Sequence, residues 1–384
     1  MSTIAFARPD VGEAEIAAVV EVLRSGWLTT GEKARQFEER FAAAVGARHA
    51  VAVSSCTAAL HLALEAAGVG PDDEVIVPTM TFAASAEVVR YLGARPVLVD
   101  SLPGDHTLDP AAVDRAVTAA TRAIVTVDFA GQPPRLDAVM ETARRRGLVV
   151  VDDAAHAFPA GYQGRAVGTI TDLTCFSFYA TKTLTTGEGG MVTTDREDWA
   201  RRVRLMSLHG ISKDAWQRHR GHNGWYYEIL APGFKYNLPD TAAALGLAQL
   251  ARSGEMLARR REIAGRYHAA FAGQDHLELL DVRPECAPAW HLYVVRLRPE
   301  VLALGRDEAI AELARRGVGT SVHFIPLHLH PYYRETYGYR PEDFPIALDL
   351  YQRSISLPIY SAMTDAEVDR VIEAVVALGR DHRR

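Results

Sequence analysis

Hydrophobic positions along the first half of the chain predict two helices and then a regular alternation of strands and helices. In residues 11–25 apolar side chains recur on one stripe of a helix, and residues 33–45 repeat the pattern up to a glycine. From residue 49 onward, short apolar runs alternate with helical segments: strands are predicted at residues 49–54, 74–78, 96–100, 123–127 and 148–152, and helices at 57–67, 82–92, 110–117 and 135–146. This alternation indicates βαβ units and a mostly parallel sheet in an α/β fold.

The predicted strands are continuous apolar runs, such as residues 148–151, rather than alternating patterns. Such runs are expected when helices cover both faces of a sheet. In open sheets of this kind, ligands bind beyond the carboxyl ends of the strands. The residues that follow each strand are therefore the first candidates for chemistry.

Small and hydroxylated residues open a helix directly after the first of these strands. The segment 54–60 contains Cys56 and Thr57 at the predicted helix start. Free N–H groups and the helix dipole make such a start an anion site suited to phosphate. A plain Ser or Thr helix cap is the alternative.

Two carboxylates end a later strand. Asp152 and Asp153 close the apolar run, and His156 follows three residues after the second acid. One acid could simply cap the next turn, and a lone histidine is often a satisfied structural residue.

A lysine follows a further buried strand, predicted at residues 173–178. Lys182 has small and hydroxylated neighbours, Ser177 lies just ahead of it, and a glycine-rich turn follows at residues 187–190. Burial disfavours the ammonium, lowers the pKa of a lysine and makes its amine a nucleophile that can form a Schiff base with a carbonyl. The alternative is a surface lysine on a loop.

A phosphate cradle, a carboxylate and a buried lysine at neighbouring strand ends are the parts that pyridoxal 5'-phosphate (PLP) needs. The lysine bonds to the cofactor, and the carboxylate holds a proton on the pyridine nitrogen, which makes the ring an electron sink during transamination. Phe82 could stack on the ring or be a core aromatic.

Nearly the whole chain resembles the sugar aminotransferases of the DegT/DnrJ/EryC1/StrS group, which have the fold type I architecture of aspartate aminotransferase. The most specific segments are residues 25–31, 152–156, 176–190, 233–237 and 323–333. Within the group, the chain is most similar to transaminases that aminate carbon 4 of UDP- or dTDP-4-keto sugars. Residues 231–238 and 289–292 are similar to the UDP-4-amino-4-deoxy-L-arabinose type in particular.

The resemblance implies roles for the residues at the strand ends. Lys182 would be the Schiff-base lysine and the proton shuttle, and Asp153 would pair with the pyridine nitrogen. His156 would bond to the phenolic oxygen of the cofactor or pack beside it.

Further cofactor contacts are implied in the same way. The phosphate would be held by Cys56 through its backbone and by Thr57 and Ser177, and Phe82 would stack on the ring. Asn237 would reach the phosphate of the neighbouring subunit, so that a homodimer is required for activity.

Three more residues, Thr30, Lys235 and His323, lie in segments that line the sugar pocket of such enzymes. The chain also departs from the common pattern of the group, with Cys56 in place of Gly or Ala, Asp152 in place of Glu and Phe82 in place of Trp. The first departure could bring a redox-sensitive thiol near the phosphate.

Two other functions stay open at this point: a PLP-dependent sugar dehydratase or lyase on the same fold, and a non-catalytic PLP-binding regulator. The related branch that dehydrates sugars has histidine in place of the lysine, so Lys182 favours transamination, with L-glutamate as the expected donor. No basic helix supports a DNA-binding regulator.

The remaining chain fits a large PLP-binding domain with an N-terminal arm (residues 1–250) and a small C-terminal α/β domain (residues 251–384). Predicted elements are helices at 239–251 and 253–272, followed by segments at 291–298, 306–316, 319–324 and 364–378. His328 and His330 alternate as on a strand, but no third metal ligand is evident. We expect them to border the sugar pocket or to pack structurally, and we expect no metal site.

Composition adds limits on partners and location. A net charge of −6 and a pI near 6.2 give no basic field for nucleic acid or an anionic membrane. Three cysteines without CxxC spacing argue against a disulfide framework or structural zinc and for a reducing compartment. With no signal-peptide pattern and no apolar run of about 18 residues, we expect a cytoplasmic enzyme.

Overall fold

A seven-stranded sheet forms the centre of the larger part of the protein. The structure is a computed structural model that describes residues 3–212 and 225–384. The strand order is β1-β9-β8-β5-β4-β2-β3. The strands are β1 (His49–Val53), β2 (Glu74–Pro78), β3 (Arg95–Val99), β4 (Thr121–Val127), β5 (Val149–Asp153), β8 (Leu173–Ser177) and β9 (Gly190–Thr194).

The predicted mostly parallel α/β sheet is confirmed. Neighbouring strands run parallel from β8 to β3, whereas β9 is antiparallel to both β1 and β8. The prediction omitted β9, which starts directly after the glycine-rich turn. Because β9 passes between β1 and β8, it brings the turn after β1 beside the strand that leads to Lys182.

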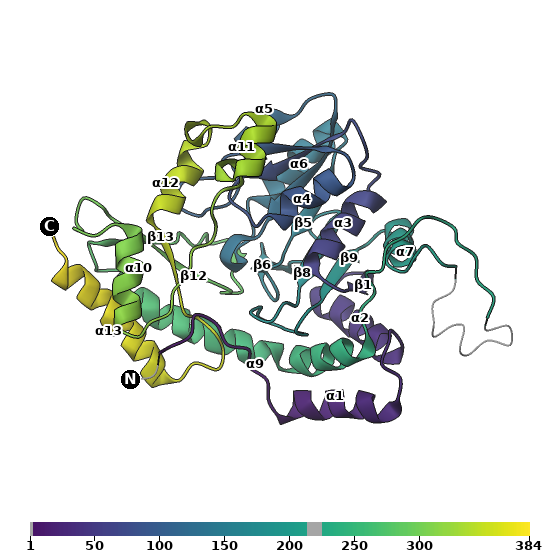
Figure 1. Cartoon of the computed structure of the whole chain (residues 1–384), viewed down its shortest axis with the longest axis horizontal. Helices are drawn as coiled ribbons and strands as arrows, with labels where there is room; N and C mark the ends of the chain where they lie inside the picture. Colours follow the sequence, from purple (N-terminus) through teal and green to yellow (C-terminus); the bar gives the residue numbers. More distant parts are fainter. Residues whose placement is uncertain (1–2, 213–224) are drawn as a thin grey trace.

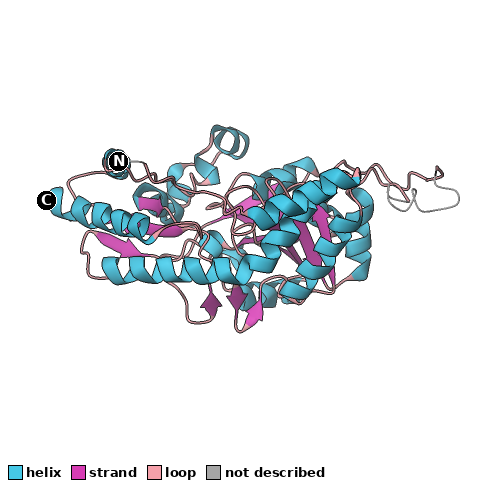
Figure 2. Cartoon of the chain, turned by 90° about the horizontal axis from the view of Figure 1, so that it is seen from below, coloured by secondary structure: helices cyan, strands magenta, loops and turns pink. Residues whose placement is uncertain are grey.

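Helices cover both faces of this sheet (Figures 1 and 2). On one face, α3 (Cys56–Ala66), α4 (Ala84–Tyr91) and α7 (Glu197–Met206) share a core with Val75 and Val77 of β2. On the other face, α5 (Pro110–Ala116) and α6 (Leu136–Arg146) share a core with Ile76. The alternation of these three β2 residues between the cores explains why the strand reads as a continuous apolar run.

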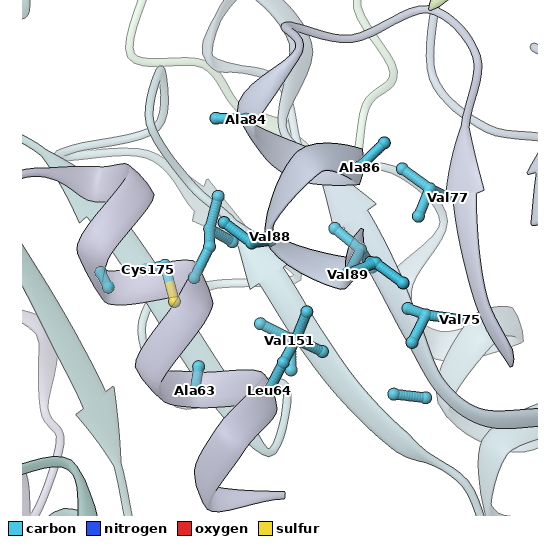
Figure 3. Packing of buried hydrophobic residues seen from close by; sticks show 14 of the residues in the cluster. Ala63, Leu64, Val75, Val77, Ala84, Ala86, Val88, Val89, Val151 and Cys175 are labelled. Atoms are coloured by element: carbon cyan, nitrogen blue, oxygen red, sulfur yellow. The ribbon is translucent and has the colours of Figure 1, made fainter. Parts of the chain in front are cut away.

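The core under α3 and α4 fixes these helices on the sheet. Figure 3 shows Val89 of α4 directed towards Val75 of β2, and Leu64 of α3 beside Val151 of β5. The side chains that line the carboxyl ends of the strands are therefore held by a close-packed apolar layer.

A smaller antiparallel sheet lies in the C-terminal part, with the order β10-β12-β13. Its strands are β10 (Leu277–Leu279), β12 (Tyr293–Leu297) and β13 (Ser354–Leu357), and its core includes α10 (Arg306–Arg315), α13 (Asp365–Asp381) and the end of α9. The other elements of this half are α11 (Pro331–Tyr337), α12 (Pro345–Arg353), η2 (Leu327–Leu329) and η3 (Pro341–Asp343), and a third small sheet joins β6 (Gly161–Tyr162), β7 (Arg165–Ala166) and β11 (Cys286–Ala287).

One predicted segment of the small α/β domain is irregular. Residues 319–324 form no strand, and only an isolated bridge joins Ser321 to Ser356. The segment instead turns His323 and Phe324 towards a cavity in the larger part. The strand in this position is β13, which the prediction omitted.

The two helices predicted around residue 252 are one helix, α9 (Asp240–Phe271), 32 residues long. Ser253 does not interrupt it, because its hydroxyl donates to the carbonyl of Leu250 within the helix. Figure 1 shows α9 running from the small sheet to α1 (Glu13–Ser25) and α2 (Glu32–Val45). The predicted domain division at residues 250 and 251 falls inside this helix and stays a prediction.

Candidate active site

A cavity of about 430 Å³ opens at the carboxyl ends of the parallel strands. Its wall is built from the turns that follow β1, β2, β5 and β8, together with three segments of the C-terminal half and residues 6 and 7 near the N-terminus. The structure brings together in this wall most of the residues singled out from the sequence: Cys56, Thr57, Phe82, Asp153, His156, Ser177, Lys182 and His323.

Lys182 lies in the cavity wall, in the turn after β8. Its backbone amide donates to the carbonyl of Tyr179 at 2.9 Å, which closes the turn. Desolvation by the surrounding protein lowers the pKa of its ammonium to about 8, against the weaker opposing effect of Cys56 and Asp153. The lysine is thus not an ordinary surface residue, because its amine is available as a nucleophile and base close to neutral pH.

Asp153 is the carboxylate of the cavity. It is buried, with 6% of its surface exposed, and it accepts hydrogen bonds from Ser85 Oγ at 2.6 Å and from the amide of Ala155 at 3.2 Å. The Cys56 thiol approaches the same carboxylate at 3.8 Å. Burial raises the pKa of Asp153, whereas the Ser85 hydroxyl, the Ala155 amide and Lys182 act in the opposite direction.

Three imidazoles form one side of the cavity. The ring centroids of His156 and His291 are 4.3 Å apart, and those of His156 and His323 are 6.4 Å apart. Burial, and after it the charge of Lys182, lowers the pKa of His323 to about 4, and burial also places the pKa of His156 and His291 well below its usual range. The three rings are therefore neutral at physiological pH and present hydrogen-bonding groups without charge.

The start of α3 forms a cradle for an anion. Ser55 caps the helix by accepting from the amide of Ala58 at 3.1 Å, and the first N–H groups of the helix, at Cys56 and Thr57, have no intrahelical partner. The turn needs Gly190 beside it, since a Cβ there would lie 2.5 Å from the carbonyl carbon of Ser55. A helix start approached closely by backbone suits a phosphate group.

These features fit PLP. The cradle at α3 would hold the phosphate, Asp153 would face the ring nitrogen, and Lys182 would face the reactive carbon. Phe82 lies at the cavity with 60% of its surface exposed and 6.0 Å from the ring of Phe324, so it is not a core aromatic.

Thr30, Lys235 and Asn237 do not line this cavity. They form their own cluster, in which Asn237 Nδ2 donates to Thr30 Oγ1 at 2.7 Å and Lys235 Nζ donates to Asn237 Oδ1. That Thr30 and Lys235 border the sugar pocket stays a prediction; the backbone of the segment 233–237 meets the end of β1, where the amide of Ser54 donates to the carbonyl of Tyr236 at 2.7 Å and Asn237 forms a bridge with Val53. The role predicted for Asn237 involves a second subunit and stays a prediction.

Packing bears on two further expectations, those for Cys56 and His328. Burial, followed by the charge of Asp153, raises the pKa of the Cys56 thiol well above its usual range, which disfavours the reactive thiolate; a redox role for this thiol stays a prediction. His328 lies in η2 and not on a strand; it is fully buried, and its Nδ1 is 2.8 Å from Thr79 Oγ1, so it packs structurally. No group of His, Cys, Asp and Glu in the described residues has the arrangement of a metal site.

Sequence reasoning missed Thr81, Ser85, His291 and Phe324. Ser85 lies among the buried apolar residues of α4 and was not considered as a site residue. A single serine among such residues could have indicated a buried hydroxyl with a specific hydrogen-bond partner. His291 belongs to the segment 289–292, which the resemblance had marked without assigning it a role.

The sequence profile of the DegT/DnrJ/EryC1/StrS aminotransferase family matches residues 9–376. Among curated proteins, the chain is similar to the spore coat polysaccharide biosynthesis protein SpsC of Bacillus subtilis, with 50% identity over 371 residues that cover 96% of this chain and 95% of that protein.

Solved structures of sugar aminotransferases share the whole fold. A protein described as a sugar aminotransferase of Streptococcus pneumoniae, Spr1654, in its PMP form, superposes with a TM-score of 0.93 at 36% identity, covering 98% of this chain and 99% of that one. The same protein has been solved in its PLP form, with a TM-score of 0.92 at 35% identity and 99% of each chain covered. PseC of Helicobacter pylori, an aminotransferase involved in pseudoaminic acid biosynthesis, superposes with a TM-score of 0.92 at 27% identity, covering 99% of this chain and 100% of that one.

Proposed function

The chain belongs to the DegT/DnrJ/EryC1/StrS aminotransferase family, and we propose that this PLP-dependent aminotransferase moves an amino group from L-glutamate to a nucleotide-activated keto sugar. The acceptor would be a UDP- or dTDP-4-keto sugar, and the product an amino sugar nucleotide. The observation that carries the proposal is one cavity that holds Lys182, Asp153 and a helix start suited to phosphate. Sugar aminotransferases of the same fold supply the class of acceptor.

PLP, when bound, supplies the electron sink that stabilises negative charge at the carbon that loses or gains a proton. The protein supplies the proton transfer and the positions. Lys182 Nζ, with its lowered pKa, accepts a proton from the donor amino acid as the neutral amine and returns it as the ammonium. Asp153, held by its hydrogen-bond donors, would lie against the ring nitrogen, where its negative charge would favour protonation of that nitrogen.

The neutral histidines serve substrate recognition in this scheme. His323 is fixed by Ser356, whose Oγ lies 2.9 Å from its Nδ1, and it contributes to the cavity from the C-terminal half. Uncharged imidazoles can accept or donate to sugar hydroxyls without repelling Lys182.

A PLP-dependent dehydratase and a non-catalytic regulator are less consistent with these features. Membership of an aminotransferase family and the presence of Lys182 both favour amino transfer. Consumption of the amino donor distinguishes these functions most simply, because a transaminase converts the donor amino acid and a dehydratase does not.

We further propose a cytoplasmic homodimer in which Asn237 completes the partner's phosphate site. Its support is the polar cluster of Thr30, Lys235 and Asn237, which lies apart from the cavity of its own subunit. The proposed cytoplasmic location is supported by the three cysteines, which are all free thiols, as is usual in a reducing compartment. None of the helices in residues 3–212 and 225–384 is both long and apolar enough to cross a membrane.

The test follows the visible spectrum of the purified, PLP-loaded protein on addition of glutamate. We expect the band of bound PLP to give way to that of pyridoxamine 5'-phosphate, with one equivalent of 2-oxoglutarate released. Lys182→Ala should slow this conversion by at least about 10³-fold. The control is Lys33→Ala, a lysine that pairs with Glu21 away from the cavity; a Lys182→Ala protein as fast as this control would refute the mechanism.

A further inference from the structure

Ser85 is a buried hydroxyl in an apolar helix. It has no exposed surface, and its neighbours in α4, Ala84, Ala86 and Val88, belong to the core beneath that helix. Figure 3 shows Ala86 of α4 beside Val77 of β2, and the buried cluster fixes α4 against the sheet. A polar side chain in such a position costs stability unless it is fully hydrogen-bonded.

The hydroxyl is part of a directed chain of hydrogen bonds. Ser85 Oγ lies 2.6 Å from Asp153 Oδ2, and Thr81 Oγ1 lies 2.7 Å from Ser85 Oγ. An ionised carboxylate only accepts, so Ser85 must donate its single proton to Asp153. Ser85 then accepts from Thr81, and the chain runs from Thr81 through Ser85 to Asp153.

We propose that Ser85, supported by Thr81, is a positioning residue that keeps Asp153 ionised and directed at the ring nitrogen of PLP. The two oxygens of Asp153 have different donors. Oδ1 receives the amide of Ala155 at 3.2 Å and the weak thiol donor of Cys56 at 3.8 Å, whereas Oδ2 receives the short Ser85 bond. A hydroxyl bond to a charged acceptor is stronger than a neutral one, and here it is the shortest of the three.

The Ser85 bond opposes the effect of burial on Asp153. Burial alone favours the protonated acid, which could not stabilise a positive ring nitrogen, and hydrogen bonds to the charged form favour the carboxylate. Without the hydroxyl, Asp153 would keep its place but would lose the donor on one oxygen. The side chain could then rotate or take up a proton.

Asp152, the residue next to Asp153 on β5, provides a matched control, because it accepts a hydroxyl bond from Thr126 on β4. Thr126 Oγ1 donates to Asp152 Oδ1, also at 2.6 Å, and both residues are fully or almost fully buried. Asp152 does not line the cavity. Removing the Thr126 hydroxyl therefore perturbs an equally short, equally buried bond that has no contact with the cofactor site.

The experiment compares Ser85→Ala with Thr126→Val, and uses Ser85→Thr to restore the hydroxyl. PLP is titrated into each apo-protein, the visible band of each loaded protein is titrated with pH, and the first turnover with glutamate is timed. We expect Ser85→Ala to weaken PLP binding and slow the first turnover by about 10- to 100-fold each, with the glutamate concentration for half-maximal rate unchanged. The midpoint of the pH titration should move upward, since a less firmly protonated ring withdraws fewer electrons.

Thr81→Val should show the same changes at about threefold, because it acts on Asp153 only through Ser85. Thr126→Val should stay within about threefold of the wild type in all three measurements, and Ser85→Thr should recover most of the loss.

Two results would overturn the proposal. One is a Ser85→Ala protein that matches the wild type in PLP affinity and in the pH midpoint. The other is a Thr126→Val protein that loses as much as Ser85→Ala, which would make the effect one of general packing. The inference rests on PLP dependence and not on the sugar acceptor; a wild type inactive with glutamate would count against the proposed donor, while the PLP and pH titrations would still test Ser85.

Discussion

Asp152 and Asp153 are consecutive residues at the end of β5, but they lie on opposite faces of the sheet. In the parallel register, Asp153 stands opposite Val127 and Cys175, whereas Asp152 stands opposite Thr126 and Thr174. Because side chains alternate along a strand, one carboxylate enters the cavity and the other enters the layer behind it.

The two faces treat a buried carboxylate differently. Asp153 has Lys182 as a nearby cation, together with hydroxyl and amide donors. Asp152 receives one hydroxyl from Thr126 and lies beside another buried acid, Asp128, whose side chain interacts with its own.

Burial raises the pKa of Asp152 to about 7, and burial together with the charges of Asp152 and Asp153 raises the pKa of Asp128 well above its usual range. Burial thus raises the pKa of all three carboxylates, but at Asp153 it is opposed by Lys182 and by hydroxyl and amide donors, whereas the charge of a neighbouring carboxylate adds to the rise at Asp152 and at Asp128. Asp153, on the cavity face, can act on a ligand. Asp152 and Asp128, on the other face, do not line the cavity and are expected to affect stability.

The largest expected effect is a difference in activity between variants of Asp153 and variants of Asp152. Asp153→Asn should slow the glutamate half-reaction by at least about 100-fold, because the amide cannot supply the negative charge that favours a protonated ring nitrogen. Asp152→Asn should stay within about threefold of the wild type, because its side chain does not reach the cavity. Single-turnover spectra of the two PLP-loaded variants measure both.

Circular dichroism and thermal unfolding serve as controls that both variants fold. Equal losses of activity would contradict the comparison, since they would show that the two faces are not separate.

A smaller effect should appear in the pH dependence of stability. The raised pKa of Asp128 means that the folded protein keeps a proton that the unfolded chain releases at about pH 4. This contribution to stability is complete below that pH and is lost as the pH rises through the folded pKa. Asp128→Asn stays neutral and escapes the loss, so its stability relative to the wild type should rise by about 1 to 3 kcal/mol between about pH 5 and pH 8.

Urea unfolding at both pH values measures this difference for Asp128→Asn. A constant offset between the proteins is acceptable, because substitution alters packing at every pH. A difference that does not change with pH would mean that Asp128 ionises freely in the folded protein.

The sequence was sufficient to predict the elements and residues that obey local rules. The alternation of apolar runs located β1 to β5 and their helices, and strand ends with Lys182, Asp153 and a hydroxylated helix start indicated the cofactor. These features depend on short stretches of chain, and the family resemblance extended them to His323.

What the sequence could not supply depends on contacts between distant segments. The bond from Ser85 to Asp153 joins residues 68 positions apart, and His291 meets His156 through a segment of the other half of the chain. The strand β9 was missed because its apolar run is short and ends in two threonines. The continuity of α9 could not be seen either, because Ser253 and Gly254 are typical of helix ends, and packing against helices such as α1 and α2 overrides this local tendency.

The smallest expected effect tests the bond behind the sheet. Thr126→Val keeps the shape of the side chain but removes the hydroxyl that donates to Asp152 at 2.6 Å. The pKa of Asp152 is raised to about 7, so above that pH the bond has a charged acceptor and below it a neutral one. A hydrogen bond to a charged group contributes about 1.5 to 3 kcal/mol and a neutral one about 1 kcal/mol, so the loss of stability should be about twice as large at pH 8 as at pH 5. Urea unfolding at the two pH values, with Asp152→Asn as the background in which the charge is absent, measures the difference. In that background the effect of Thr126→Val should no longer change with pH; if it does, the pH dependence arises from another group, and Asp152 does not ionise over this range.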